Sequence, residues 1–282
     1  FFFIVMWWEV GCGFVGIALV GYTFQDYLLY YPTIENSRTQ FLKPTGTLAN
    51  VFEEHFLTTE DNVRLNLWLF RHSNPSRPTL LFFHGNAGNI SHRLLNIRSL
   101  FEDLQCNVAI LEYRGFGKSD GWPTQKGIEI DAKTALHWLK SDAGTPNSPI
   151  ILYGRSLGGA VSIHLAASEQ ENLDGIIIEN TFTCIADMMD VLMKYLTWAK
   201  FLLRNPWRSI DLISSIKKPL LFISSTNDEL VPSFMMESLY SKAPESNKTI
   251  LRYPLHHMDC WTAPTYTSDI KEWMTSQGFY KD

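Results

Sequence analysis

Cysteine is scarce in this sequence, and its few copies lie far apart. The four cysteines are Cys12, Cys106, Cys184 and Cys260, and no two of them form a Cys-x-x-Cys pair. Structural zinc sites are built from closely spaced cysteines, and disulfide frameworks belong to short, cysteine-dense chains. We therefore expect neither a metal centre nor a disulfide framework, and the pattern fits reduced, buried thiols.

A basic charge balance is also absent. The chain has 24 Lys and Arg against 29 Asp and Glu, which gives a net charge of −5, and no run of like charges occurs. Proteins that bind nucleic acids carry basic patches or stripes, so the charge gives no reason to expect a nucleic-acid partner. There is no repeat at a fixed period. The 282 residues, 45% of them hydrophobic, suit a full-sized core in one large domain or at most two.

The first 24 residues carry a single charged side chain, Glu9, in an otherwise apolar run. A helix of about 20 apolar residues crosses the hydrocarbon core of a bilayer, and aromatic residues such as Trp7, Trp8 and Tyr22 often mark the membrane interface. We predict that residues 1–24 form a membrane anchor helix. The alternatives are a cleaved signal peptide, for which no clear cleavage site follows, and a helix packed on the soluble domain.

After this run the chain divides into a linker and one large domain. Residues 32–50 are polar and interrupted by proline and glycine, as linkers are, and we predict a linker over residues 25–50. From 51 to 282, apolar strands alternate with amphipathic helices. Strands are predicted within 53–70 (two, around a turn at Asp61-Asn62), 78–89, 106–121, 150–168, 173–180, 219–226 and 248–254. Helices are predicted within 92–104, 124–140, 150–168, 232–243 and 267–277. This order predicts an α/β fold, with a parallel sheet covered by helices on both faces.

The motifs that carry chemistry follow the predicted strands. They are His84-Gly85, the segment 154–158, Asp228 and His256-His257. In open parallel sheets, active sites lie beyond the carboxyl ends of the strands. We therefore expect these motifs to meet at one edge of the sheet.

The segment Gly154-Arg155-Ser156-Leu157-Gly158 stands between an apolar strand and a helix of small residues. A Gly-x-Ser-x-Gly turn in this context is the nucleophile elbow, which exposes its serine above the sheet. The simpler interpretation is that the glycines only make a tight turn. We predict that Ser156 is a nucleophile.

A nucleophilic serine of this kind needs a histidine base and an acid, in the chain order Ser, acid, His. Of the eight histidines, only His256 and His257 follow an acid that itself follows Ser156 at a strand end. Asp228 is the favoured acid, since it comes directly after an apolar strand, and Glu179 is the second candidate. The alternative for Asp228 is a cap on the next helix.

An oxyanion hole needs two N–H donors aimed at the developing charge. One is expected to be the backbone N–H of Leu157, directly after the nucleophile. The other should come from the loop His84-Gly85-Asn86-Ala87, where Asn86 is favoured and Ala87 is the alternative. His84 itself is expected to be a structural hydrogen-bonding group.

A long insertion at about residues 181–211 separates two predicted strands. It is rich in methionine, leucine, phenylalanine and tryptophan, and it is too apolar for an ordinary surface helix. It is interpreted either as core helix or as a cap whose flexible methionines meet an apolar ligand; Asp187 and Asp190 within it are expected to be solvated or capping residues. The residues predicted to line an acyl pocket are Met188, Met189, Leu192, Met193 and Leu196.

Six motifs in order, "HGNAGN", "LEYRGFGKSDG", "YGRSLGGAV", "IIENTF", "NDELVP" and "HHMDCW", resemble the ABHD-type α/β hydrolases. Within them, the chain is most similar to the Bem-type branch of single-pass, membrane-anchored serine hydrolases, from about residue 50 to 278. The resemblance implies an eight-stranded sheet and a triad of Ser156, Asp228 and His257. Relatives often have Gly-His-Asn-Asp at the histidine, whereas here His256 and Met258 replace the glycine and the asparagine.

Together these observations predict a membrane-anchored serine hydrolase that cleaves acyl esters or thioesters. Some relatives remove acyl chains from protein cysteines and others cleave monoacylglycerols or small esters, so the expected substrate is a lipid or an acylated protein. The bilayer is the expected partner, and no cofactor is implied. The alternative is a non-catalytic protein of the same fold that binds a ligand or partner.

Overall fold

Eight strands pair into one sheet in the computed structural model, which describes residues 22–141 and 143–280. Their order is β1-β2-β4-β3-β5-β6-β7-β8. β1 and β2 run antiparallel to their neighbours, and all other pairs are parallel. The eight-stranded, mostly parallel sheet that the resemblance implies is confirmed. The strands are β1 (Phe52–Thr58), β2 (Arg64–Phe70), β3 (Thr79–Phe83), β4 (Asn107–Glu112), β5 (Ile150–Arg155), β6 (Gly175–Glu179), β7 (Leu220–Ser225) and β8 (Lys248–Tyr253).

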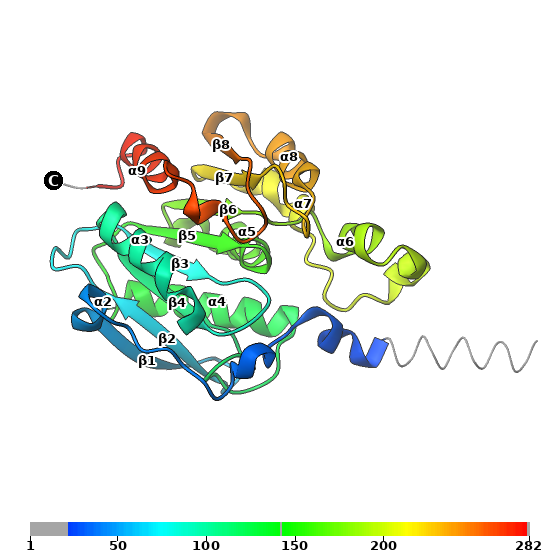
Figure 1. Ribbon diagram of the computed structural model, residues 1–282, viewed down its shortest axis with the longest axis horizontal. Helices are drawn as coiled ribbons and strands as arrows, with labels where there is room; N and C mark the ends of the chain where they lie inside the picture. The colour runs from blue at the N-terminus through cyan, green and yellow to red at the C-terminus, as the bar shows by residue number, and fades with distance from the viewer. Residues whose placement is uncertain (1–21, 142, 281–282) are drawn as a thin grey trace, which may run out of the picture.

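Helices cover both faces of this sheet (Figure 1). Side chains alternate between the two faces along a strand, so Leu81 and Phe83 of β3 join one core cluster while Leu80 and Phe82 join the other. Because both faces of the central strands are buried under helices, these strands are apolar along their whole length. The helices of the first face are α4 (Gln125–Lys140), α5 (Leu157–Glu169) and α8 (Ser233–Lys242), and those of the second are α3 (Leu94–Leu104) and α9 (Tyr266–Ser276).

The segment ahead of the sheet packs on the domain. Residues 1–21, which hold most of the predicted anchor, lie outside the described residues. A helical segment runs over residues 22–29, and within the described ranges no helix is long and apolar enough to cross a membrane. Tyr30 is buried, and its hydroxyl accepts a hydrogen bond from Trp207 Nε1 at 2.9 Å. The beginning of the predicted linker 25–50 is therefore fixed against the domain.

The insertion between β6 and β7 forms a cover that projects beyond the sheet (Figure 1), and its partly buried Ile185, Met188 and Val191 pack against the first core cluster. It consists of α6 (Ile185–Leu192), the 3₁₀ helix η4 (Lys194–Leu202) and α7 (Ser209–Leu212). No residue of α6 or η4 is buried. The interpretation of this stretch as core helix is therefore wrong for α6 and η4. In the rest of this article, "the cap" means residues 181–211.

Candidate active site

Ser156 lies at the tight turn between β5 and α5. Its backbone has φ 54° and ψ −119°, a conformation that costs a non-glycine residue about 1–3 kcal/mol. The flanking glycines allow the turn to close: a Cβ on Gly158 would lie 1.9 Å from the carbonyl oxygen of Phe83, and one on Gly154 would lie 2.1 Å from that of Gly158. Strand, strained serine and helix thus form the geometry that the sequence predicts for a nucleophile elbow.

His257 and Asp228 meet beyond the ends of β7 and β8. His257 Nδ1 lies 2.6 Å from Asp228 Oδ2, and both side chains are almost completely buried. The other carboxylate oxygen, Oδ1, accepts the backbone N–H groups of Leu230 and Val231 at 2.9 and 2.7 Å. Asp228 does not cap α8, whose N-cap residue is Pro232. An ionised carboxylate only accepts hydrogen bonds, so this arrangement leaves Nε2 of His257 as the ring atom that is free to take a proton.

His256 faces away from this pair. Its side chain is 67% exposed, and Nδ1 lies 3.2 Å from the carboxylate of Glu229, which is itself 62% exposed. Ser156 and His257 both line one cavity, whereas His256 does not. The tertiary structure therefore distinguishes two histidines that adjoin in sequence.

Glu179, the second candidate for the acid, lies in a separate buried network. Its carboxylate pairs with Arg155 at 2.6 Å and accepts the hydroxyl groups of Tyr153 and Tyr266 at 2.7 and 2.6 Å. The Tyr153 and Tyr266 rings belong to the core cluster beneath α3 and α9. Glu179 thus neutralises a buried guanidinium, and no hydrogen bond joins it to a histidine in the part of the chain that the structure describes.

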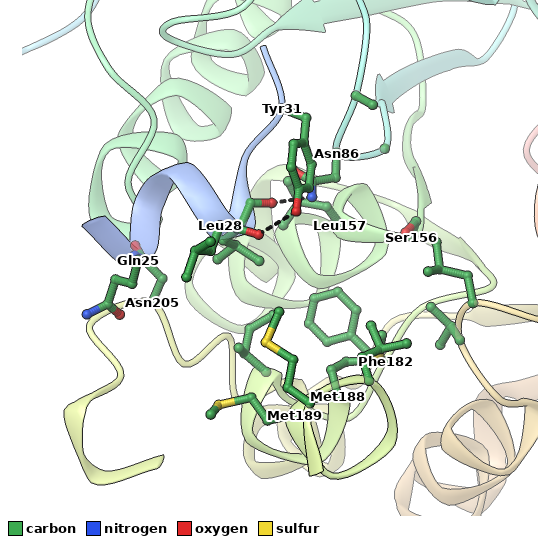
Figure 2. Close-up of a pocket in the computed structure, with 18 of the residues that line it drawn as sticks. Gln25, Leu28, Tyr31, Asn86, Ser156, Leu157, Phe182, Met188, Met189 and Asn205 are labelled. Atoms are coloured by element: carbon green, nitrogen blue, oxygen red, sulfur yellow. Dashed lines mark hydrogen bonds between the residues drawn. The ribbon is translucent and has the colours of Figure 1, made fainter. Parts of the chain in front are cut away.

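The residues predicted to supply the oxyanion hole lie at the wall of the cavity that holds Ser156. Leu157 is the first residue of α5, where N–H groups have no partner inside the helix. Asn86 lies in the loop after β3, and both residues line the cavity with Ser156. Ala87, the alternative donor, lines it as well. Figure 2 shows Asn86 beside Leu157, with Ser156 farther along the same wall.

His84 is fully buried, and its Nδ1 lies 2.7 Å from the carbonyl oxygen of Gly85. Burial lowers the pKa of His84 to about 3, so the ring is neutral at physiological pH. Its backbone carbonyl accepts the hydroxyl of Tyr113 at 2.9 Å. This side chain therefore shapes the loop, as expected from the sequence.

Sequence reasoning missed Asn180, directly after β6. Its φ is 47°, which asparagine tolerates better than most residues. Its side-chain amide donates to the backbone carbonyl of His257 at 2.8 Å and accepts the N–H of Ser225 at 2.7 Å. The next residue, Thr181, donates from its hydroxyl to the carbonyl of Ser156 at 2.7 Å. Together Asn180 and Thr181 connect the loop of Ser156 to the loop of His257. The signal in the sequence was the pair of polar residues that follows the apolar strand in "IIENTF".

A cavity of about 840 Å³ joins these groups to the cap. Its wall opposite Ser156 comes mainly from the cap, and Figure 2 shows Met188 and Met189 facing into it. All residues predicted for an acyl pocket line this cavity: Met188, Met189, Leu192, Met193 and Leu196. In the same segment, Asp187 accepts the Thr183 hydroxyl and Asp190 pairs with Lys200 at 2.5 Å. These two carboxylates are thus occupied in the cap itself.

Known proteins share both this sequence and this architecture. Residues 78–206 match the family described as alpha/beta hydrolase fold. The alpha/beta hydrolase domain-containing protein WAV2 of Arabidopsis thaliana is 40% identical over 88% of this chain and 87% of its own. The chain belongs to the α/β-hydrolase family. Protein bem46 of Schizosaccharomyces pombe is 39% identical over 80% of this chain and 77% of its own, which places this α/β hydrolase in the Bem-type branch.

A third relative and two solved structures extend the likeness. The yeast protein YNL320W, named an uncharacterized membrane protein, is 33% identical over 97% of this α/β hydrolase and the whole of its own length. The esterase Pf2001 of Pyrococcus furiosus superposes with a TM-score of 0.69 at 21% identity, over 84% of this chain and 95% of its own. An α/β hydrolase from Vibrio vulnificus gives 0.72 at 20% identity, over 90% and 92%. At these identities the two structures support the fold alone.

Proposed function

We propose that this α/β hydrolase is a serine hydrolase that cleaves esters or thioesters of acyl chains at a membrane. One observation carries the proposal: a strained Ser156 and His257, whose ring Asp228 holds from behind, line the same apolar cavity. A serine is a weak nucleophile until a neighbouring base removes its proton, and the base must itself be oriented by a third group. The three side chains supply these roles.

In the proposed reaction, Ser156 Oγ attacks the acyl carbonyl carbon while its proton passes to His257 Nε2. The carbonyl oxygen becomes an oxyanion, which the N–H groups of Leu157 and Asn86 stabilise. Collapse of this intermediate breaks the bond to the leaving alcohol or thiol, and that group takes the proton from His257. A water molecule then gives a proton to His257 and its oxygen attacks the acyl-enzyme. The acid leaves, and Ser156 regains its proton. Asp228 holds the imidazole in one tautomer throughout.

The lining of the cavity supports an acyl group as the substrate portion bound there. Its volume of about 840 Å³ falls in the range of small-molecule sites. Phe182, Ile185, Val231 and the predicted methionines and leucines make most of the wall apolar. Burial of each methylene contributes about 0.8 kcal/mol, so an extended acyl chain gains affinity there.

The surface around the cavity supports action at a membrane. Tyr195 and Phe201 of the cap are 94% and 78% exposed, and Tyr27 and Leu28 ahead of the sheet are more than half exposed. The two segments are neighbours, since Gln25 donates to the carbonyl of Leu202 at 3.1 Å. Exposed apolar patches of this kind mark interaction sites. Tyr27 and Leu28 follow the predicted anchor in the sequence, and one relative is named a membrane protein.

Covalent labelling tests the proposal. A fluorophosphonate probe should label the purified protein, and Ser156→Ala should abolish labelling and ester turnover while circular dichroism and melting temperature stay close to those of the parent. Ser168→Ala, an exposed serine later in the same helix, is the matched control and should label normally. Absence of labelling in the folded parent chain would instead support the non-catalytic ligand-binding alternative.

A further inference from the structure

Residues 25–31, which we name the N-terminal strap, form part of the cavity wall. They precede the first strand by about twenty residues, yet Gln25, Leu28, Leu29 and Tyr31 all line the cavity that holds Ser156. Figure 2 shows Tyr31 beside Asn86, with the Tyr31 hydroxyl directed to the carbonyl of Leu28. The strap therefore lies at the candidate site, although its sequence reads as the start of a linker.

The strap binds the loop that follows β3, residues 84–89, which we name the oxyanion loop. Both the side chain and the backbone of Asn86 take part. The side-chain amide of Asn86 donates a hydrogen bond to the backbone carbonyl of Leu29, and its backbone carbonyl accepts the N–H of Tyr31 at 3.2 Å. Tyr31 and Ala87 also form a parallel β-bridge. These bonds do not use the backbone N–H of Asn86. Among the described residues, no protein group accepts a hydrogen bond from it.

Asn86 depends on the strap more than its neighbours in the loop do. His84 Nδ1 lies 2.7 Å from the carbonyl oxygen of Gly85, and Arg93 donates to the carbonyl of Ala87 at 2.6 Å. Glycine has wide backbone freedom, and Gly85 and Gly88, the latter at φ 79°, lie on either side of Asn86. Among the described residues, the hydrogen bonds of Asn86 itself go to the strap.

The strap is itself fixed on its opposite side. Asp26 is buried and accepts hydrogen bonds from Arg204 and Asn205, at the end of the cap. Gln25 accepts the N–H of Arg204 at 2.6 Å. The strap thus connects the end of the cap to the oxyanion loop.

We propose that the strap is a positioning element of the active site, and that the Asn86 side chain is the positioning residue that aims the Asn86 N–H at the oxyanion. The proposal rests on the proposed serine-hydrolase function. Loss of one oxyanion donor typically lowers kcat 10²–10³-fold, and misplacement of a catalytic group by about 1 Å costs up to about 10²-fold. Because Asn86→Ala keeps the N–H and the backbone bond to Tyr31 and removes only the side-chain bond to Leu29, we expect a fall in kcat of about 10- to 100-fold, with KM changed less than about threefold.

The experiment compares Asn86→Ala and Asn86→Asp with Tyr280→Phe. The aspartate keeps the size of the side chain but presents an acceptor to the Leu29 carbonyl, and it gives a second measurement if the alanine variant does not accumulate folded. Tyr280→Phe is the matched control, since it removes a hydrogen bond from the Tyr280 hydroxyl to the carbonyl of Leu104 at 2.7 Å, and Tyr280 belongs to neither the strap nor the cavity wall. Tyr280→Phe should lower the melting temperature and leave kcat unchanged.

A trifluoromethyl ketone inhibitor supplies the decisive measurement. Ser156 adds to its carbonyl and the serine proton moves to His257, which leaves a hemiketal oxyanion in the hole. In the Asn86 variants its affinity should fall by the same factor as kcat/KM, whereas a merely destabilised site well below its melting temperature would keep that affinity. Equal affinity and kcat in Asn86→Ala, Asn86→Asp and the parent would overturn the positioning role. A parent chain that neither hydrolyses esters nor reacts with the ketone would overturn the proposed function instead.

Discussion

The two sides of the cavity are built in opposite ways. On the sheet side, Leu157 and Asn180 are almost fully buried, and Gly158 packs so tightly on β3 that no side chain fits. On the other side, no residue of α6 or η4 is buried, and Tyr195 stands almost fully in solvent. Close packing of the first kind fixes positions to fractions of an ångström. The cap side has no buried residue in α6 or η4, so its side chains are less tightly held.

This difference assigns the two sides different tasks. Groups that move protons and hold an oxyanion need positions exact to about 0.5 Å, which a packed sheet edge provides. An acyl chain needs apolar surface of suitable volume, which flexible methionines provide without exact positions. Substitutions on the sheet side should therefore stop the reaction or unfold the protein. Substitutions in the cap should change which substrate is preferred.

The largest expected effect separates the two adjacent histidines. His257→Ala removes the base that Asp228 orients, and kcat on an activated ester should fall at least about 10⁴-fold. His256→Ala removes only an exposed contact with Glu229 and should change kcat less than about threefold. Steady-state kinetics of both variants on one p-nitrophenyl ester measure this. Equal losses, or a larger loss at His256, would reverse the assignment.

A second pair of variants separates two carboxylates on the sheet side. Asp228→Asn should lower kcat about 10³- to 10⁴-fold with little change in stability, because the amide no longer holds the working tautomer. Glu179→Gln leaves the buried Arg155 guanidinium without its counter-charge, so the free energy of unfolding should fall by about 3–5 kcal/mol. Its kcat per folded molecule should stay near that of the parent. Urea unfolding and steady-state kinetics on the same samples distinguish the two roles. A large loss of kcat in folded Glu179→Gln would favour Glu179 as the acid of the triad.

The sheet side should also respond to pH through Glu112. Burial raises the pKa of Glu112 to about 7, although its carboxylate accepts the N–H groups of Ile90 and Lys118. A folded-state pKa above the unfolded value means that the folded state binds more protons between about pH 4.5 and 7. Its stabilising contribution is therefore full at the acid end and is lost as pH rises, by roughly 3 kcal/mol.

Glu112→Gln tests this pH dependence because the amide does not titrate. Urea unfolding at pH 5 and pH 8 should show the parent losing about 2.5 kcal/mol relative to Glu112→Gln, since part of the titration lies below pH 5. Glu60→Gln, an exposed glutamate, is the control and should follow the parent at both pH values. Parallel curves for the parent and Glu112→Gln would mean that the two N–H donors offset the burial.

The smallest expected effect lies in the cap. For the parent, kcat/KM should rise several-fold per two carbons from acetyl to medium-chain esters, since each pair adds up to about 1.6 kcal/mol of burial. Met189→Ser with Met193→Ser should flatten this slope without stopping acetate hydrolysis. Because α6 has no buried residue, the melting temperature should stay within a few degrees. A flat profile in the parent would point to a small-ester hydrolase.

Much of the sheet side follows from local patterns in the sequence. Apolar runs of five or six residues form buried strands wherever helices cover both faces, and β3, β5, β6 and β7 lie where those runs are. The elbow could be predicted because Gly154 and Gly158 are required by clashes with the chain's own backbone. Such constraints act over a few residues, so a sequence displays them directly.

Only the tertiary structure decided which of the two candidate acids meets the histidine, and only it brought residues 25–31 to the site. Glu179 and Asp228 both end strands, but Glu179 is directed to the core beneath α3 and α9 while Asp228 meets His257. Side chains on a strand alternate between faces, so a shift of one residue at a strand end changes the neighbours completely. The strap at residues 25–31 depends on bonds to residues more than fifty positions away. Its sequence is too short to show a periodic pattern, and it is buried Tyr30 and hydrogen bonds to distant segments that hold it in place.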